Sequence, residues 1–240
     1  VRNLAAQGTD LIVVGSFTAA GGVIGASRIA RWNGSAWSVI GSTGANSTVD
    51  GLLVDGTDIY VSGDFGTIGG ISAVHAAKWD GTSWSALGSG LSGSGTTIAK
   101  LGTDIYFGGS FTTADGVASP CVAKWDGTAW SAAGLPLTGL NGFVLCLAAA
   151  GGDLYAGGRY TTAANGSPAG NRISRWNGSA WSAVGDDSVD DYVNHLITSG
   201  SSVIAVGRFT APHSHIARFD GSAWQSMLAG LGQGLDADGY

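Results

Sequence analysis

Short apolar stretches recur along the chain, each lying between residues that favour turns. A turn residue stands directly before the stretch at five places: Asp10, Asp58, Asp104, Asp153 and Ser202. Each stretch ends in glycine, one variable residue and an aromatic residue, at Gly15–Phe17, Gly63–Phe65, Gly109–Phe111, Gly158–Tyr160 and Gly207–Phe209. Apolar stretches this short, bounded by turn residues, are typical of β-strands. The pattern predicts an all-β protein of many short strands.

A hexapeptide with the pattern Trp-Asn/Asp-Gly-Ser/Thr-X-Trp follows each stretch. Its five copies are Trp32–Trp37, Trp79–Trp84, Trp125–Trp130, Trp176–Trp181 and, with phenylalanine in the first place, Phe219–Trp224. All nine tryptophans lie in it, and the first aromatics are 47, 46, 51 and 43 residues apart. A basic residue precedes each copy, namely Arg31, Lys78, Lys124, Arg175 and Arg218. This spacing suits a four-stranded propeller blade.

The second repeat shows how these landmarks divide a unit into strands a to d. Strand a is expected at 51–54, strand b at 59–65, strand c at 76–79 and strand d at 84–87. Asp-Gly and Asn-Gly turns suit tight hairpins, because glycine accepts a positive φ, so consecutive strands should be antiparallel. The b-to-c loops are longer and variable. One unit cannot bury both faces of its sheet, so we expect neighbouring units to stack, whereas a β-sandwich would not explain the constant hexapeptide.

The fold predicted for residues 1–240 is therefore a single five-bladed β-propeller of four-stranded antiparallel blades. Its units are placed at 1–41, 42–88, 89–134, 135–185 and 186–229, and are called units 1 to 5 below. Residues 230–240 form a tail or the start of a further unit, because Leu235–Gly239 is similar to the end of strand a in unit 2. A longer array of blades is the alternative. Because the first residue is Val1, we expect a processed or excised piece.

Composition narrows the partners. The chain has 42 glycines, and all 17 of its carboxylate side chains are Asp, a bias that favours turns over helices. The net charge of −6 argues against nucleic acid, which requires a clustered basic surface. The longest apolar run, Phe143–Ala150, is too short to span a bilayer, so no membrane insertion is expected.

Metal, cofactor and disulfide chemistry find little support. Cys121 and Cys146 lie on different strand types of neighbouring units and are predicted to be buried free thiols. The acidic segment Asp186–Asp191 could supply oxygen ligands to calcium, but it lacks the spacing of an established calcium loop and is better explained as a solvated connection. His213 and His215 have no evident third ligand. No metal and no cofactor are predicted.

The repeats resemble kelch-like propeller repeats, in which Gly-Gly follows a strand b aromatic and a later Tyr and Trp flank a turn. Tyr106–Gly109 and Tyr155–Gly158 match the first part, and Trp125 with Trp130 stands where the Tyr and Trp would be. The peptide sequence Lys-Trp-Asp-Gly-Thr-Ala-Trp-Ser-Ala is also similar to repeats of large secreted or cell-surface bacterial proteins. That similarity implies an extracellular location and a role in adhesion or surface assembly.

Variable positions inside this constant frame are the candidate ligand-binding residues. One position lies between the glycine and the aromatic that end strand b, and the other lies three residues before the basic residue; both bracket the b-to-c loops. The first is Ser16, Asp64, Ser110, Arg159 and Arg208, and the second is Arg28, His75, Cys121, Arg172 and His215. By contrast, the repeated tryptophans should pack, and the basic residue should place its head near a turn Asp such as Asp80 or Asp126.

The function predicted from these residues is non-enzymatic: an exported adhesion, scaffold or protein-interaction module that binds a protein or a glycan at the loop-rich rim. The alternative is a multivalent lectin with one weak site per blade, laid out like the five-bladed tachylectins. A glycosidase would need two converging carboxylates, whereas Asp50, Asp55, Asp64 and Asp115 are scattered along the chain. No nucleophile elbow, phosphate loop or His-Glu metal motif is present.

Overall fold

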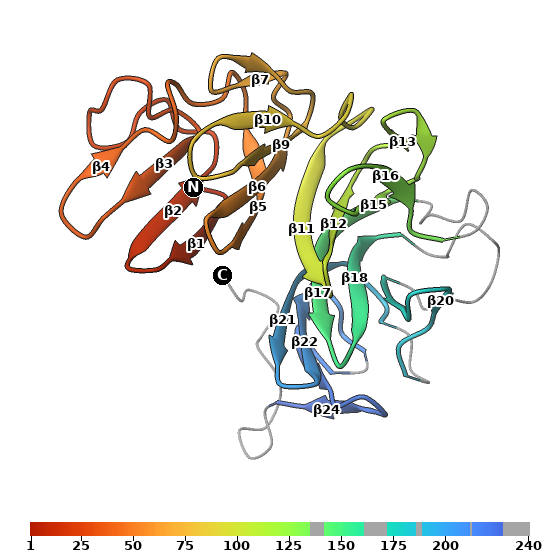
Figure 1. Ribbon diagram of the computed structural model, residues 1–240. Helices are drawn as coiled ribbons and strands as arrows, with labels where there is room; N and C mark the ends of the chain where they lie inside the picture. Colours follow the sequence, from red (N-terminus) through yellow and green to blue (C-terminus); the bar gives the residue numbers. More distant parts are fainter. Residues whose placement is uncertain (135–141, 161–171, 186–188, 212, 228–240) are drawn as a thin grey trace.

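A computed structural model describes residues 1–134, 142–160, 172–185, 189–211 and 213–227. These residues form five four-stranded antiparallel sheets, one in each predicted unit (Figure 1). In every sheet the strands lie side by side in the order a, b, c, d. No helix that could cross a bilayer occurs in the part of the chain that the structure describes.

The strand bounds are close to those predicted. Unit 1 holds β1 (Asn3–Gln7), β2 (Asp10–Val14), β3 (Ile29–Trp32) and β4 (Trp37–Ser38). Unit 2 holds β5 (Val49–Asp55), β6 (Asp58–Gly63), β9 (Ala76–Trp79) and β10 (Trp84–Ala86). Unit 3 holds β11 (Gly95–Leu101), β12 (Asp104–Gly109), β15 (Val122–Trp125) and β16 (Trp130–Ala132). Unit 4 holds β17 (Phe143–Ala150), β18 (Asp153–Arg159), β19 (Ile173–Trp176) and β20 (Trp181–Ser182). Unit 5 holds β21 (Val193–Ser199), β22 (Ser202–Gly207), β23 (Ile216–Phe219) and β24 (Trp224–Ser226).

Two of the b-to-c loops contain small hairpins that the sequence did not predict. β7 (Thr67–Ile68) pairs with β8 (Ile71–Ser72) in unit 2, and β13 (Thr113–Ala114) pairs with β14 (Val117–Ala118) in unit 3. Isolated bridges join Ile68 to Ala45 and Ala114 to Leu91, so each hairpin is tied to the connection that enters its own unit. These loops are therefore held against the sheets.

The hexapeptide forms the c-to-d turn and closes it with a side chain. In unit 3 the Asp126 carboxylate accepts hydrogen bonds from the backbone N–H groups of Thr128 and Ala129 and from the Thr128 hydroxyl, each at 2.8 Å. Asn33 makes the same three contacts in unit 1. The glycine of each turn has a positive φ, +102° at Gly127, which explains why no other residue type stands there. The two flanking tryptophans then face each other, with ring centroids 5.3 Å apart for Trp125 and Trp130.

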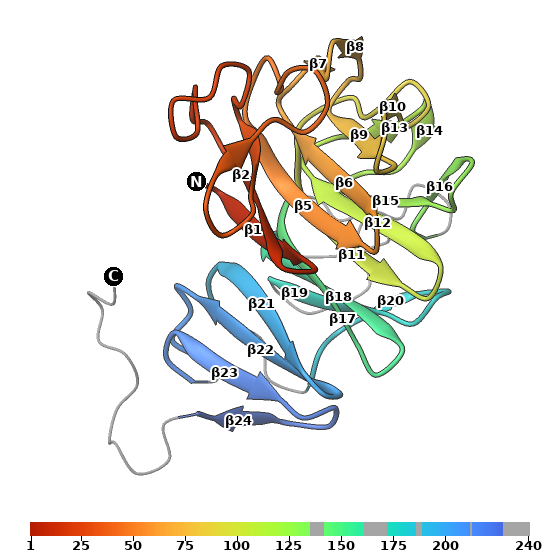
Figure 2. The same ribbon diagram turned by 60° about the vertical axis from the view of Figure 1, so that its left-hand side comes forward.

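Consecutive sheets stack through their first strands. β1 packs against β5, β5 against β11, β11 against β17 and β17 against β21, so that these strands follow one another in chain order (Figure 2). Apolar side chains fill the space between units; Leu52 of unit 2, for instance, lies in one cluster with Ile12 and Val14 of unit 1. This stacking confirms the prediction that each unit needs a neighbour to cover its sheet.

The second tryptophan of each hexapeptide reaches back to the preceding unit. Its indole Nε1 donates to a backbone carbonyl that lies just after strand d of that unit. The four bonds are Trp84 to Ile40 at 2.9 Å, Trp130 to Leu87 at 2.7 Å, Trp181 to Ala133 at 2.9 Å and Trp224 to Val184 at 3.0 Å. The repeated tryptophans of units 2 to 5 are all buried, as the packing interpretation predicted. We call each carbonyl with its indole donor an indole link.

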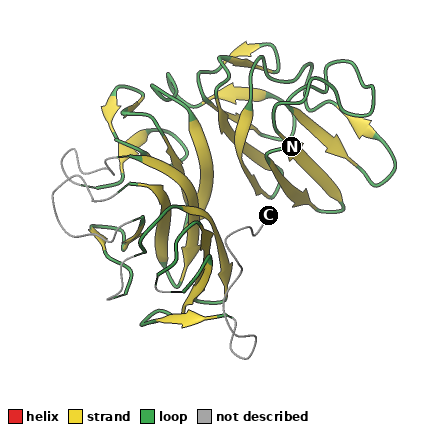
Figure 3. Ribbon diagram, turned by 180° about the vertical axis from the view of Figure 1, so that it is seen from behind, coloured by secondary structure: helices red, strands yellow, loops and turns green. Residues whose placement is uncertain are grey.

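The five sheets form an arc. β21 has no packing against β1 comparable to that between consecutive first strands, among the strands that the structure describes. The β1–β4 sheet and the β21–β24 sheet lie apart at the two ends of the series in Figures 1 and 3. The predicted five units are thus present, whereas contact between the first and the last of them is not observed in the described residues.

Candidate functional site at the loop-rich rim

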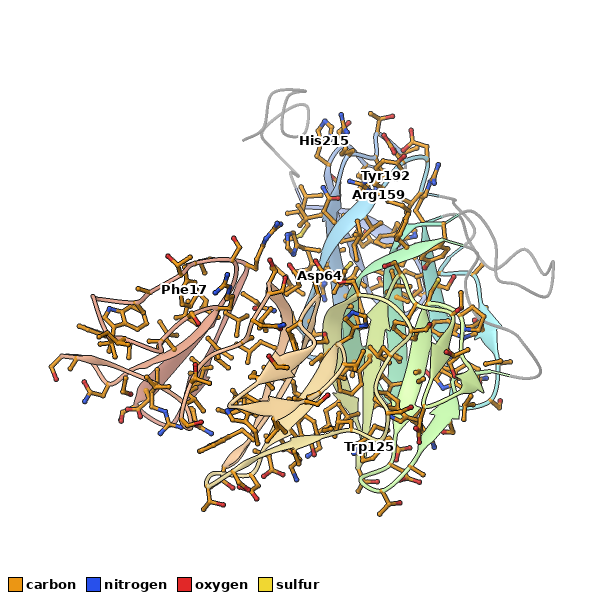
Figure 4. All side chains as sticks on the ribbon, turned by 90° about the horizontal axis from the view of Figure 1, so that it is seen from above. Phe17, Asp64, Trp125, Arg159, Tyr192 and His215 are labelled. Carbon is orange, nitrogen blue, oxygen red and sulfur yellow. The ribbon has the colours of Figure 1, made fainter. Side chains whose placement is uncertain are left out.

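One edge of the arc carries both the b-to-c loops and the connections between units, because strands b and d end where strands a and c begin. We call this edge the loop-rich rim. All ten variable positions predicted from the sequence lie beside it, at the ends of strand b or at the ends of the b-to-c loops. The hexapeptide turns lie at the opposite edge. In Figure 4 the labelled Trp125 accordingly lies far from Arg159 and Tyr192.

The second variable position closes the b-to-c loop with a left-handed backbone. Arg28, His75, Cys121, Arg172 and His215 have φ values between +61° and +69°. Each forms a pair of backbone hydrogen bonds with the end of strand b; the N–H of Arg172 donates to the Tyr160 carbonyl at 3.1 Å, and its own carbonyl accepts from Gly158 at 3.0 Å. A positive φ is uncommon for these residue types. The backbone is thus constant, while the side chain differs between units.

Units 4 and 5 meet at the rim in a stack of three side chains. Arg159 lies at the end of β18, Arg172 closes the following loop, and Tyr192 directly precedes β21. Both guanidinium groups lie over the Tyr192 ring, with Cζ 4.9 Å from the ring centroid for Arg159 and 5.1 Å for Arg172. Cation–π attraction between each guanidinium and the Tyr192 ring offsets part of the repulsion between the two cations. We call these residues the Arg–Tyr–Arg stack; Figure 4 labels two of them, Arg159 and Tyr192.

The stack has unused donors. Neither arginine forms an ion pair with another described residue. The Arg172 Nε is buried without a hydrogen-bond partner among the described residues, although the side chain as a whole is half-buried. Arg159 is exposed at the end of its strand. Because neighbouring atoms cover the Arg172 Nε, an acceptor that reaches the rim would meet the exposed Arg159 side chain first.

The other junctions between units use different chemistry. His75 Nδ1 hydrogen-bonds with the Leu91 carbonyl at 2.8 Å, and the Cys121 thiol donates to the Gly142 carbonyl. His215 Nδ1 lies 3.2 Å from the Gly207 carbonyl of its own unit. Each unit thus holds its own pair of candidates, such as Ser16 with Arg28 in unit 1, but among the described residues only Arg159 and Arg172 share a side-chain partner, Tyr192.

Asp64 takes part in a second cluster that the sequence did not reveal. The Arg2 guanidinium Nε lies 3.6 Å from the Asp50 carboxylate. Burial raises the pKa of Asp50; the Arg2 charge lowers it, and the neighbouring Asp64 charge raises it. The prediction that these carboxylates are scattered was therefore wrong for Asp50 and Asp64. The sequence carries no direct signal for this pair, because Asp50 lies at the irregularity between Val49 and Gly51 and Asp64 lies just beyond the end of β6, where its N–H donates to the Thr48 carbonyl.

The basic residue before the hexapeptide has a different partner from the one predicted. Lys78 pairs with Asp58 at 2.7 Å and Lys124 with Asp104 at 3.0 Å, and both carboxylates come from the a-to-b turn. The expected hexapeptide partners, Asp80 and Asp126, cap their own turns instead. This pairing links strand c to the start of strand b at the edge opposite the rim, so it fixes the sheet.

No group of three or more metal-binding side chains occurs among the described residues. Asp186 and Asp187 of the acidic segment lie outside the described residues. Asp190 accepts from the Thr210 backbone N–H at 2.7 Å and from its hydroxyl at 2.6 Å, so this carboxylate caps a loop. Cys121 and Cys146 are free and buried, as predicted. The possible start of a further unit at 230–240 also lies outside the described residues.

Comparison with known proteins supports the fold and goes no further. No protein-family model and no curated protein sequence matches the chain. Solved structures do resemble it. A computationally designed protein, Ika8, has a TM-score of 0.55 and 14% identity over 90% of this chain and 57% of its own. YCF48 bound to D1 peptide has a TM-score of 0.51 and 14% identity over 91% of this chain and 63% of its own. The chain has a propeller-like repeat fold and spans less than two thirds of either structure.

Proposed function

We propose that this propeller-like chain is a non-enzymatic protein-interaction module, and that it binds acidic peptide segments at the loop-rich rim. The observation that carries the proposal is the Arg–Tyr–Arg stack. Arginine is the side chain best suited to planar, bidentate recognition of a carboxylate, because its donors are fixed in a fork. Stacking on Tyr192 holds both forks in place before a ligand arrives, which reduces the entropy lost on binding.

The chain's own charge makes the stack selective. The formal net charge is −6, so an acidic partner is repelled by much of the surface and attracted to two cations that have no ion pair with another described residue. An aromatic side chain and two arginines are also the residue types enriched where protein interfaces concentrate their binding energy. YCF48, which resembles this chain in fold, was solved with the D1 peptide bound, and this supports considering a peptide as the partner of a propeller-like fold.

The proposal also covers the family relationship, the location and the number of blades. We infer a kelch-like relationship from the Gly-Gly pairs and the Trp-flanked turn. We infer an extracellular or cell-surface location, with an adhesive or scaffolding role, from the similarity of the repeat sequence to that of secreted bacterial proteins. A closed five-bladed ring requires unit 5 to meet unit 1. The separation of these two units supports the longer array as the functional form.

A multivalent lectin would need similar pockets in each unit. The variable positions at the rim differ between units, pairing Ser16 with Arg28, Asp64 with His75, and Arg159 with Arg172. The buried tryptophans of units 2 to 5 leave no open indole face for a sugar to stack on. These observations favour a single distinct site over five equivalent sites.

The test is peptide binding by the purified chain. We would screen an array of acidic peptides beside versions of the same peptides whose carboxylates are amidated or replaced by neutral side chains. The Kd of the best binders is then measured by calorimetry. The double variant R159Q/R172Q should weaken binding by at least about tenfold, because hydrogen bonds to charged groups contribute about 1.5–3 kcal/mol. Tyr192→Ala should also weaken it, whereas Tyr192→Phe, which keeps the ring, should not.

The matched control is Arg28→Gln, which changes an arginine with the same left-handed backbone in unit 1. This variant should bind acidic peptides like the parent chain. Equal loss from Arg28→Gln and from R159Q/R172Q would contradict the proposed site. Equal binding of neutral and acidic peptides, or retention of binding only to glycans on a parallel array, would contradict the proposed partner.

A further inference from the structure

Each interface between units has two components that recur along the chain. The first is the indole link. The second is an apolar residue of strand a that covers the preceding sheet; Leu52, Ile98 and Leu147 hold this position in units 2, 3 and 4 and are only 7–8% exposed. Leu52 and Trp84 lie in the cluster that includes Ile12 and Val14 of unit 1. An incoming unit therefore always presents a tryptophan and an aliphatic side chain to the unit before it.

Unit 1 has the same two groups, and no other described unit packs against them. Leu4 stands where Leu52 stands, since Leu4 pairs with Val13 as Leu52 pairs with Val61, and it is 58% exposed. Trp37 completes an intact hexapeptide, yet it is only half-buried, and its indole N–H has no hydrogen-bond partner among the described residues. We call Leu4 and Trp37, with the sheet between them, the open face of unit 1.

We propose that the open face of unit 1 is a docking surface for a preceding four-stranded unit of the same repeat, joined to the chain ahead of Val1. The observations that carry it are the four internal interfaces, in which the equivalent groups are covered by such a unit. The proposal is independent of the peptide-binding function.

The sequence at the other end of the chain departs from the pattern of the internal interfaces. Each carbonyl of an indole link is followed by a glycine with positive φ, namely Gly41, Gly88, Gly134 and Gly185. A Cβ at Gly41 would lie 2.9 Å from Cδ1 of the incoming Trp84, and one at Gly185 would lie 3.0 Å from Cδ1 of Trp224. The sequence has Leu228 at the corresponding place after Met227. Unit 5, in this chain or in a second copy, therefore lacks the glycine that follows the acceptor carbonyl in all four internal interfaces.

The experiment extends the full chain by one unit. A copy of residues 1–48 is placed ahead of Val1, which keeps the native connection, because Val1 and Val49 hold the same place relative to strand a. The added copy carries W37F, so that the original Trp37 is the only one at its position. We expect the hydrogen exchange of the original Trp37 indole N–H, measured by NMR, to slow at least tenfold on extension, and the Tm to rise by several degrees.

Two further variants distinguish docking from a merely tethered unit. Leu4→Asp should leave the Tm of the 240-residue chain unchanged and lower that of the extended chain, whereas Ile24→Asp, at a 96% exposed loop residue, should change neither. Gly41→Leu in the added copy, which imitates Leu228, should restore fast exchange at Trp37. Unchanged Trp37 exchange on extension, or an equal effect of Leu4→Asp in both chains, would overturn the proposal. So would a dimer of the 240-residue chain, by light scattering, in which Trp37 is already protected.

Discussion

The indole link can be isolated energetically within one hexapeptide. Trp79 and Trp84 flank the same turn, their ring centroids are 5.6 Å apart, and both are buried. Trp84 Nε1 donates to the Ile40 carbonyl at 2.9 Å, whereas Trp79 Nε1 is buried without a partner. Replacing either by phenylalanine removes a similar volume. Only the Trp84 replacement also leaves a carbonyl unpaired between two units.

We therefore expect W84F to destabilise the chain more than W79F does. Orphaning a buried acceptor costs about 1–3 kcal/mol, and this difference should appear on top of a packing loss that the two variants share. W79F also removes an unsatisfied donor, and unit 5 has Phe219 at that position naturally. At about 2–4 °C per kcal/mol for a chain of this size, W84F should melt roughly 2–12 °C below W79F.

The assay is urea unfolding of both variants and the parent chain at one temperature, followed by near-ultraviolet circular dichroism, with thermal melts alongside. W37F provides a third comparison, because Trp37 is half-buried and has no indole link; its effect should be smaller than that of W84F. If W79F proved as destabilising as W84F, the hydrogen bond between units would contribute nothing measurable, and the reasoning behind the indole link would be refuted.

Three further predictions concern single groups. Asp126→Asn keeps an acceptor and should reduce stability less than Asp126→Ala does in thermal melts. Hydrogen bonds to the carboxylate hold its pKa at about 2, so the stability that its charge contributes should be present above about pH 4 and disappear toward pH 2. Equal melting of both variants would count against the capping role. Burial raises the pKa of Cys121 to about 11 and raises that of Cys146 further. Neither thiol should therefore react with iodoacetamide at pH 8 in the folded chain, whereas both should react after unfolding, and mass spectrometry measures the difference. Asp50 should titrate above its ordinary value in NMR, and Arg2→Gln should raise its pKa further, because the Arg2 charge lowers it; a fall would contradict the assignment.

The local parts of the fold were predictable because the repeat encodes them locally. The hexapeptide turn, the antiparallel order of strands and the five units all follow from turn chemistry within a few residues of each landmark. The loop-closing position was found as a variable site, although its left-handed backbone was not foreseen. Arg159 and Arg172 were both proposed from this pattern.

Contacts between distant residues were less accessible. The carbonyl that receives each indole lies 40–48 residues away in the chain, and nothing in the hexapeptide identifies it. Lys78 and Lys124 were assigned to the nearest carboxylate in sequence, but the paired strands bring Asp58 and Asp104 closer. Tyr192 was missed because its role arises only where unit 5 meets the two arginines of unit 4. The curvature of the arc depends on how all the sheets stack and has no local signature.

The direction of the indole link has a consequence for biosynthesis. Every donor tryptophan lies later in the chain than the carbonyl that receives it, so on the ribosome the acceptor has already emerged when its donor appears. Units could then be added one at a time from the amino end, each new sheet completing its interface against a finished one. Such vectorial assembly would shorten the time during which apolar sheet faces are open to aggregation while translation proceeds.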